Sequence, residues 1–330
     1  MNEERLRWFR QSVERVKAEV GKVIVGQEDV VEGILLCLLA GGHVLLEGVP
    51  GVGKTKIVRT LSAVLDLKFS RIQFTPDLMP ADITGTEILI EDPDGGRSFR
   101  FQPGPIFANV ILADEINRAT PRTQSALLEA MQERQVTVSG KSYKLDEPFI
   151  VLATQNPIEM EGTYTLPEAQ LDRFTFKLKV EHASYEGMRE ILRRTTYGEE
   201  PMPERVIGAE EIMEMQKLVR DVPVASHVED YIINLIRMTH PSGDDAPDIV
   251  RRYVEYGSSV RGAQAIVLTA KARALCRGRY NVSLDDVRAV AMPALRHRII
   301  KSYEAEVEGI EADQIIEDLL RWRGRGSPAY

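Results

Sequence analysis

The chain has 330 residues, enough for one large domain or two moderate ones, and 43% hydrophobic and 28% charged residues are ordinary values for a globular protein in water. Its net charge of −8 argues against general nucleic-acid binding, although a locally basic pore would escape that argument. The longest apolar stretch, residues 33–40, is too short to cross a bilayer, and the charged N-terminus is unlike a signal peptide. We therefore expect a cytoplasmic protein without membrane insertion.

Up to about residue 180, helical and strand patterns alternate along the chain. Apolar residues at three- and four-residue steps predict a helix through residues 6–20, and a second helix follows through Leu39. Short apolar runs then predict strands, with helices between them at residues 54–65 and 123–131. The predicted strands are residues 43–47, 69–74, 110–115, 149–153 and 174–178. Paired short strands around turn signals predict two β-hairpins, at residues 86–101 and 135–145.

The pattern changes near Glu181, beyond which strand signals almost disappear. Amphipathic helical patterns continue at residues 188–194, 212–219, 228–238, 263–276, 284–300 and 315–320. Breaks rich in acidic residues, proline or glycine interrupt them at residues 198–203 and 242–247. The sequence therefore predicts an α/β domain over residues 1–180 and a smaller all-α domain over residues 181–330.

The segment Gly48-Val-Pro-Gly-Val-Gly-Lys-Thr55 fits the pattern G-x-x-x-x-G-K-[ST] of a phosphate-binding loop. It lies between a predicted strand and a predicted helix, so a glycine-rich turn without a ligand is the weaker interpretation. The glycines allow consecutive N–H groups to converge on phosphate oxygens, while Lys54 would reach the β- and γ-phosphates and Thr55 would ligate Mg²⁺. The expected nucleotide contacts are Gly48, Val49, Pro50, Gly51, Val52, Gly53, Lys54 and Thr55.

Two carboxylates end the predicted strand at residues 110–115, at the edge where open α/β sheets bind ligands. Asp114 would hold Mg²⁺ through water, and Glu115 would polarise the attacking water. An acidic strand end without a role is the alternative, and the upstream loop makes it the weaker one. Asn156 follows the next strand and could orient the same water. Taken alone, Asn156 is better explained as a turn residue before proline.

Two arginines stand at places where they could reach a nucleotide. Arg173 in Leu171-Asp-Arg-Phe174 comes just before a strand, and Arg261 opens a helix in the second predicted domain. An arginine at such a place is more often only solvated. Arg261 either contacts phosphates or lies at the start of a helix without a functional role, and the residues alone leave both interpretations open.

In their order along the chain, these motifs resemble those of the AAA+ ATPases. The amino-acid sequences of residues 104–119 and 166–174 are similar to those of the MoxR family. The two hairpins match its helix-2 and pre-sensor-1 insertions, which magnesium chelatase and MCM-type ATPases share. The resemblance covers residues 20 to 300 and is weaker in the second domain. It implies an α/β P-loop AAA+ core with a parallel sheet and two β-hairpin insertions, followed by a smaller all-α lid domain.

The resemblance also implies a role for each candidate residue. These roles are Walker A for Lys54 and Thr55, Walker B for Asp114 and Glu115, sensor 1 for Asn156, arginine finger for Arg173 and sensor 2 for Arg261. Val25 and Gly26 match the region that touches adenine in such folds. Arg118 and Arg122 are expected near the subunit boundary, where either is an alternative to Arg173 as the residue that acts in trans.

The resemblance implies ATP hydrolysis with Mg²⁺ by a homo-oligomeric ring, expected to be hexameric, that remodels or matures a client protein. The client of this family often carries a von Willebrand factor A domain or a metal centre. A motor that translocates nucleic acid is the alternative. Against it stand the acidic charge and the second hairpin tip, residues 138–143, which offers one lysine and one tyrosine. A third hypothesis is a nucleotide-dependent scaffold that hydrolyses ATP hardly at all. Glu115 makes it less attractive, because this residue is expected to polarise the attacking water.

Overall fold

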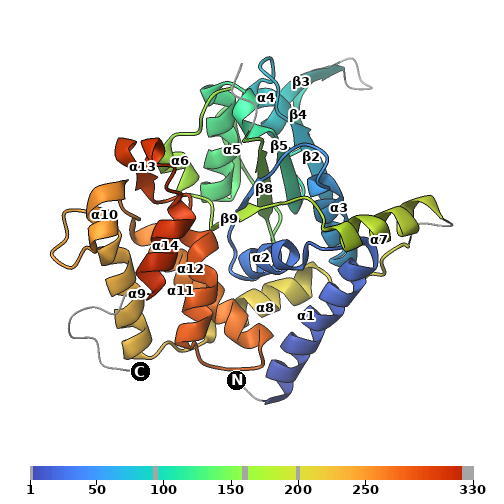
Figure 1. Cartoon of the computed structure of the whole chain (residues 1–330). Coiled ribbons are helices and arrows are strands. Elements are labelled where there is room, and N and C mark those ends of the chain that lie inside the picture. The colour runs from blue at the N-terminus through green and yellow to red at the C-terminus, as the bar shows by residue number, and fades with distance from the viewer. Residues whose placement is uncertain (1–2, 92–95, 158–162, 198–200, 322–330) are drawn as a thin grey trace. The chain divides into compact units, whose positions relative to one another are not determined.

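The computed structural model describes two compact units of the chain (Figure 1). Described are residues 3–91, 96–157, 163–197 and 201–321. We call residues 14–167 and 178–214 the sheet unit. The helical unit consists of residues 1–13, 168–177 and 215–330. The chain therefore passes between the units more than once, and a single domain boundary at residue 180 stays a prediction.

The sheet unit is built on a five-stranded sheet with the strand order β2-β5-β8-β1-β9. The strands are β1 (Val44–Glu47), β2 (Phe69–Gln73), β5 (Val110–Asp114), β8 (Ile150–Gln155) and β9 (Phe176–Lys179). The pairs β2–β5, β5–β8 and β1–β8 are parallel, and their register puts Gln73 beside Asp114 and Glu47 beside Gln155. The carboxyl ends of these strands consequently share one edge. The sheet confirms the parallel strands predicted from the apolar runs.

The sheet unit also contains the helices α2 (Glu28–Leu39), α3 (Lys54–Val64), α4 (Pro80–Thr84), α5 (Pro121–Glu133) and α7 (Tyr185–Thr196), while α1 (Glu3–Val23) and α8 (Ala209–Asp221) each span both units. Helices α2 and α3 pack on the sheet through apolar residues. Leu38 of α2 and Leu61 of α3 line a small apolar cavity with Ile150 and Leu152 of β8. All four side chains are buried, and burial of each such side chain stabilises the fold by about 1.5–3 kcal/mol.

Both predicted hairpins are present. The first pairs β3 (Gly85–Glu91) with β4 (Arg97–Pro103), although most of its predicted turn lies outside the described residues, and the second pairs β6 (Gln135–Val138) with β7 (Lys141–Lys144). The hairpins contact each other, because the ring of Tyr143 stacks on that of Phe101 with centroids 3.9 Å apart. Lys141 forms an ion pair with Glu87 at 3.2 Å. The lysine and the tyrosine of the second tip are thus engaged within the protein.

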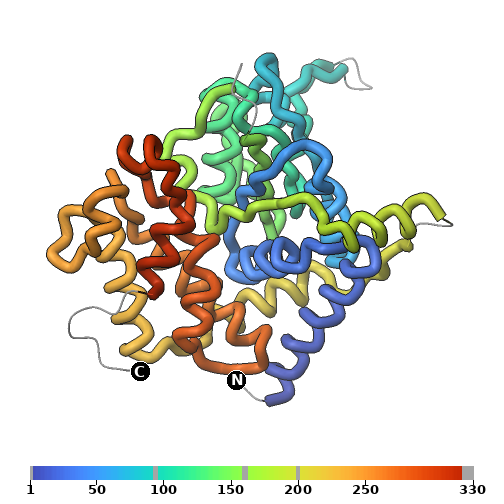
Figure 2. Tube along the Cα trace, in the orientation of Figure 1, coloured from blue at the N-terminus to red at the C-terminus, as the bar shows by residue number. Residues whose placement is uncertain are grey.

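The helical unit consists mainly of helices, as predicted. They are α6 (Glu168–Leu171), α9 (Ser226–Met238), α10 (Asp248–Tyr253), α11 (Val260–Cys276), α12 (Leu284–Leu295), α13 (Tyr303–Val307) and α14 (Ala312–Arg321). Helices α11 and α12 run side by side (Figure 2). A short antiparallel pair, β10 (Val254–Tyr256) and β11 (Ile300–Lys301), interrupts the helices. The helix predicted over residues 284–300 was therefore too long: α12 ends at Leu295, just after Pro293, which cannot donate a backbone hydrogen bond.

A buried carboxylate stabilises the start of α12. Asp286 is fully buried and accepts hydrogen bonds from Arg273 at 2.6 Å and from Arg279 at 2.6 and 2.7 Å. Burial opposes its ionisation, but the hydrogen bonds from Arg279, Ser283 and Arg273 outweigh that effect and lower the pKa of Asp286 to about 2. Asp286 also closes a capping box with Ser283 at the helix N-terminus.

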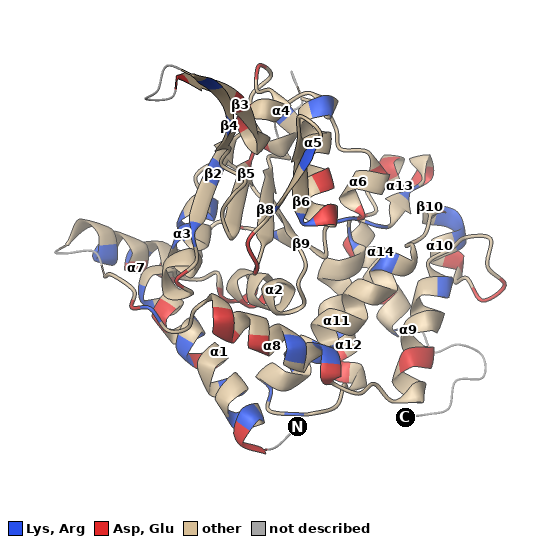
Figure 3. Ribbon diagram, turned by 180° about the vertical axis from the view of Figure 1, so that it is seen from behind, with Lys and Arg blue, Asp and Glu red and all other residues tan. Residues whose placement is uncertain are grey.

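Charges of both signs share the exposed helix faces. Figure 3 shows acidic and basic residues interspersed along α8 and α9, so these helices carry no basic stripe of the kind that nucleic-acid binding favours. Among the described residues, no helix is both long enough and apolar enough to span a membrane.

His43 links the end of α5 to the middle of the sheet. Its Nε2–H donates to the carbonyl of Met131 at 3.1 Å, and its Nδ1 accepts from the N–H of Val151 at 3.0 Å. Burial, with a smaller contribution from the charge of Arg134, lowers the pKa of His43 to about 3. The ring is therefore neutral in the folded protein at neutral pH.

This low pKa predicts an acid-dependent loss of stability that His43→Gln should reduce. In the unfolded chain His43 binds a proton below about pH 6.5, whereas in the folded protein it stays neutral until the pH approaches 3. The contribution of His43 to the free energy of unfolding is therefore complete above about pH 6.5 and falls as the pH drops toward 3. Between these limits wild type should lose about 1.4 kcal/mol per pH unit relative to the variant. Denaturant unfolding of both proteins from pH 7 to pH 4.5 measures this difference. A difference that does not change with pH would contradict the assignment.

Candidate functional site

The glycine-rich loop at residues 48–55 connects β1 to α3. Gly51 and Gly53 have φ angles of +86° and +90°, values that disfavour any residue with a Cβ. Gly53 is also the N-cap of α3 and offers no side chain to cap it. The first N–H groups of the helix thus face the loop, the arrangement that binds anions at helix N-termini. Lys54, the first residue of α3, turns its ammonium to the carbonyls of Gly48 and Val49.

Asp114, the last residue of β5, is held by two neighbouring strands. Thr154 of β8 donates its hydroxyl to Oδ1 of Asp114 at 2.7 Å and accepts the N–H of Glu115 at 2.8 Å. Arg71 of β2 donates to Oδ2 from Nε at 3.1 Å and from Nη2 at 2.6 Å. Both carboxylate oxygens are therefore oriented by charge-assisted or hydroxyl hydrogen bonds at the edge of the sheet.

Glu115 leaves the strand in a left-handed conformation, with φ at +57°. Its Oε2 accepts hydrogen bonds from Gln73 of β2 at 2.8 Å and from Arg118 at 3.0 Å. A non-glycine residue in this region of φ is uncommon and is often found at functional sites. The strand predicted over residues 110–115 consequently ends one residue earlier, at Asp114.

Asn156 follows β8 and is buried, with 6% of its surface exposed. The preceding residue, Gln155, accepts the N–H of Gly48 at 3.3 Å, so the start of the glycine-rich loop is attached to the end of β8. The sheet unit thus brings the loop, Asp114, Glu115 and Asn156 to one edge, in agreement with their predicted proximity. Thr154, Arg71 and Gln73 belong to the same edge but were not singled out from the sequence.

A cavity of about 320 Å³ lies beside the glycine-rich loop. Val25 and three residues of the loop, Gly51, Val52 and Gly53, form part of its lining. Gly26 is not among the lining residues, although it adjoins Val25. The rest of the lining is mainly apolar and comes from the segment around Val25, from the start of α3 and from residues 182–201: Val23, Ile24, Gln27, Lys56, Ile57, His182, Ala183, Met188, Ile191, Arg194, Thr195 and Pro201.

Two side chains fasten the walls of this cavity to each other. Arg194 of α7 donates to the carbonyls of Gly21 and Lys22 at 2.8 and 2.6 Å, and Gln27 donates to the carbonyl of Glu181 at 2.7 Å. These bonds tie the end of α1 to α7 and the start of α2 to the segment that precedes α7. The sequence predicts a helix over residues 188–194 but gives no signal that this helix lies beside the loop, because more than a hundred residues separate the two.

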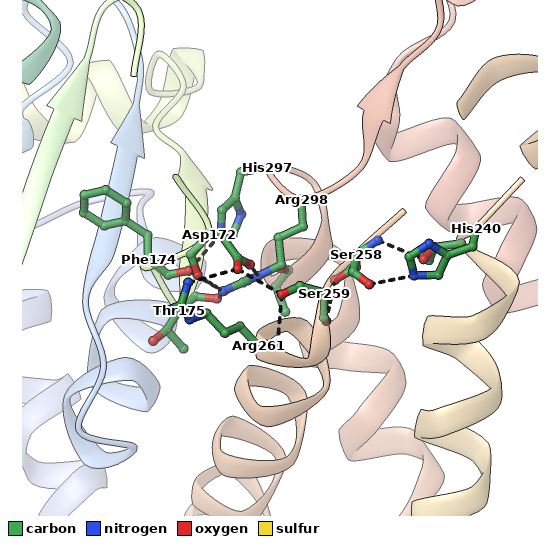
Figure 4. Close-up of polar contacts among 11 residues, drawn as sticks. Asp172, Phe174, Thr175, His240, Ser258, Ser259, Arg261, His297 and Arg298 are labelled. Atoms are coloured by element: carbon green, nitrogen blue, oxygen red, sulfur yellow. Dashed lines mark hydrogen bonds and ion pairs between the residues drawn. The ribbon is translucent and has the colours of Figure 1, made fainter. Parts of the chain in front are cut away.

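The remaining candidate arginines lie in different environments. Arg118 and Arg122 are exposed residues of the sheet unit, whereas Arg173 and Arg261 belong to the helical unit. Arg173 is half-buried in the turn after α6, and Arg261 forms an ion pair with Asp172 at 3.4 Å. Figure 4 shows this pair beside the start of α11.

Known families match two parts of the chain. Residues 43–176 match the ATPase family associated with various cellular activities (AAA), and residues 247–319 match the AAA lid domain. Over 310 residues the chain is 43% identical to the chaperone MoxR1 of Mycobacterium tuberculosis, with 94% of this chain and 81% of the relative covered. The chain belongs to the MoxR family of AAA+ ATPases.

Two further comparisons extend over nearly the whole chain. Protein MoxR of Methylorubrum extorquens is 31% identical, with 95% of this chain and 94% of the relative covered. The crystal structure of a candidate ATPase from Cytophaga hutchinsonii matches with a TM-score of 0.90 and 43% identity over 98% of both chains. These matches confirm the predicted AAA+ fold, a parallel sheet followed by a helical lid.

Proposed function

We propose that this chain binds ATP with Mg²⁺ at the carboxyl edge of the sheet and hydrolyses it within a homo-oligomeric, hexameric ring that remodels or matures a client protein. One observation carries the proposal: the glycine-rich loop, Asp114, Glu115 and Asn156 converge at one edge of the sheet unit. The loop supplies N–H groups for phosphates, and the edge supplies carboxylates for a cation and a water.

The cavity beside the loop is suited to the nucleoside. Its volume of about 320 Å³ is within the usual range for small-ligand sites, and its apolar lining suits the faces of a purine. Val25, Met188 and Ile191 would contact the base, with Gly51 to Gly53 leading toward the phosphates. In the bound state, Lys54 would exchange the carbonyls of its own loop for phosphate oxygens, because a full negative charge is the stronger acceptor.

The oxygen donors at the edge fit Mg²⁺, which prefers carboxylate, hydroxyl and water ligands. Thr55 offers a hydroxyl and Asp114 a carboxylate that Thr154 and Arg71 already hold in place. Each carboxylate oxygen has more than one acceptor site, so Asp114 can also accept a water of the hydrated ion. When bound, the ion would neutralise charge on the β- and γ-phosphates.

Glu115 is proposed to polarise the attacking water and Asn156 to orient it. Gln73 and Arg118 fix the carboxylate of Glu115, which limits its rotation and favours a defined approach to the water. Arg173 would stabilise the transition state of a neighbouring subunit, and Arg261 would respond to the nucleotide as sensor 2. Exposed Arg118 and Arg122 are the alternatives to Arg173 for the role in trans.

The remodelling role is supported by the chaperone name of the relative MoxR1. A client with a von Willebrand factor A domain and a cytoplasmic location remain predictions.

The alternative of a nucleic-acid motor is disfavoured by the second hairpin, because Lys141 and Tyr143 are used in contacts with Glu87 and Phe101. Stimulation of turnover by DNA in a salt-sensitive manner would favour the motor instead, whereas product release that no partner stimulates would favour a scaffold.

Lys54→Ala tests nucleotide binding. The variant should lose about 10- to 100-fold in affinity for Mg-ATP, because a charge-assisted hydrogen bond to phosphate contributes about 1.5–3 kcal/mol. Calorimetric titration measures the change. Lys68→Ala is the matched control, since exposed Lys68 precedes β2 at the opposite edge of the sheet. Equal affinity in wild type and Lys54→Ala would remove the proposed site.

A further inference from the structure

Arg298 follows α12 and has all its guanidinium N–H groups engaged (Figure 4). Nε donates to Oδ1 of Asp172 at 2.8 Å, and Nη2 donates to the carbonyls of Asp172 and Phe174 at 2.9 and 2.7 Å. Nη1 donates to the carbonyl of Thr175 at 3.2 Å and to that of Ala294. The side chain is 3% exposed. These bonds account for all five N–H groups that an arginine side chain carries.

Three of these acceptors are backbone carbonyls that flank Arg173 on both sides. The turn is fixed further because the N–H of Arg173 bonds the carbonyl of Gln170 at 3.2 Å. On the other side, His297 donates from Nε2 to the carbonyl of Phe174 at 2.8 Å, and the ring of Phe174 is fully buried. Burial, with the charge of Arg298, lowers the pKa of His297 well below its ordinary value, so the ring remains a neutral donor.

The second oxygen of Asp172 reaches the start of α11. Oδ2 accepts the hydroxyl of Ser259 at 2.9 Å and the Nη1 of Arg261 at 3.4 Å. Gly262 permits this tight N-terminus, since a Cβ there would lie 2.1 Å from the hydroxyl of Ser258. One carboxylate therefore joins Arg298, which holds the turn of Arg173, to Arg261.

We infer that Arg298 is a positioning residue for hydrolysis: its planar guanidinium sets the place of Arg173 through the carbonyls around it, and that of Arg261 through Asp172. The inference rests on the proposed role of Arg173 in trans. A buried guanidinium is costly to assemble for stability alone, because its charge must be removed from water even when all its donors are paired. An arginine finger, in contrast, benefits directly, since a misplacement of about 1 Å can cost about 100-fold in rate.

Arg298→Lys separates positioning from folding. Lysine keeps the positive charge beside Asp172, but its single nitrogen cannot span the carbonyls of Asp172, Phe174 and Thr175. The kcat for ATP should fall about 10- to 100-fold, with KM within about twofold of wild type. Arg273→Lys is the matched control, because Arg273 donates to buried Asp286 in the same unit, at the opposite end of α11 from Arg261. It should lower the unfolding midpoint without a comparable loss of kcat.

Subunit mixing gives a readout that a general loss of stability would not produce. Arg298→Lys keeps its glycine-rich loop but misplaces its finger, so mixing it with Lys54→Ala should raise activity above the sum of the two. Mixing it with Arg173→Ala should give no increase, because both lack a working finger. An increase with Arg173→Ala, or none with Lys54→Ala when subunits exchange, would overturn the inference.

Hydrogen exchange tests the positioning without nucleotide. Amide protection at Arg173 and Phe174 should fall at least about tenfold in Arg298→Lys and remain unchanged in Arg273→Lys. Unaltered protection together with wild-type kcat overturns the inference, even where Arg173→Ala is inactive. A fully active Arg173→Ala would instead remove the proposed finger. Should Arg298→Lys fail to fold, Asp172→Ala removes the side-chain acceptor of Nε, one of the five bonds, and should show the same mixing pattern with a smaller loss.

Discussion

Glu115→Gln is expected to lower the rate of ATP hydrolysis by about 10²- to 10⁴-fold while ATP affinity stays close to that of wild type. Glutamine has nearly the shape of glutamate and can still accept the hydrogen bonds from Gln73 and Arg118. It cannot take a proton from the attacking water. Asp114 and Thr55 are unchanged, so the sites proposed for the cation and the phosphates remain.

Two measurements on the same preparation test this separation: titration of Mg-ATP for affinity and steady-state phosphate release for turnover. We also expect ATP to stay bound longer and the oligomer to persist in size-exclusion chromatography. Glu129→Gln on the exposed face of α5 is the control for loss of one charge and should behave as wild type. Turnover at the wild-type rate in Glu115→Gln would mean that another group polarises the water.

Sequence reasoning found the parts of the site that are local in the chain. The glycine-rich loop carries its own pattern, and Asp114 with Glu115 ends an apolar strand. Thr154 and Arg71 were missed because their contacts to Asp114 depend on strand order: β2 and β8 flank β5, although they are far from each other in sequence. Neither threonine nor arginine is unusual in a strand, so the roles of Thr154 and Arg71 become visible only when the pairing of the strands is known.

The same limit explains why the sequence did not single out Arg298. The apolar pattern through Ile300 predicts a helix over residues 284–300, in which Arg298 would have no evident role. The structure ends α12 at Leu295 and turns the following residues back onto the turn of Arg173. Periodicity reports which positions are apolar, but it does not report where a helix containing Pro293 stops or which carbonyls the next arginine meets.

Arg173→Ala is expected to lose hydrolysis by about 10³- to 10⁵-fold and to bind ATP nearly as well as wild type. An arginine finger contributes this much because its charge matters mainly in the transition state. Since the finger serves the neighbouring subunit, the variant's own glycine-rich loop is intact. Titration of Mg-ATP and phosphate release separate the two effects. Arg122→Ala is the matched variant, and a comparable loss with normal binding would transfer the role in trans to Arg122. Because Arg118 also holds Glu115 within its own subunit, a loss in Arg118→Ala would transfer the role only if mixing with Lys54→Ala restored activity.

If Arg173 acts in trans, mixing two inactive variants should restore activity, a result that a residue acting within its own subunit cannot give. Neither Arg173→Ala nor Lys54→Ala should hydrolyse ATP alone, but in a mixed ring some interfaces join an intact loop from the first variant to an intact finger from the second. Activity should therefore peak at intermediate mixing ratios and fall on dilution below the assembly concentration. Exchange of labelled subunits provides the control. Exchange without any recovered activity, at every ratio, would show that Arg173 does not act on a neighbouring subunit.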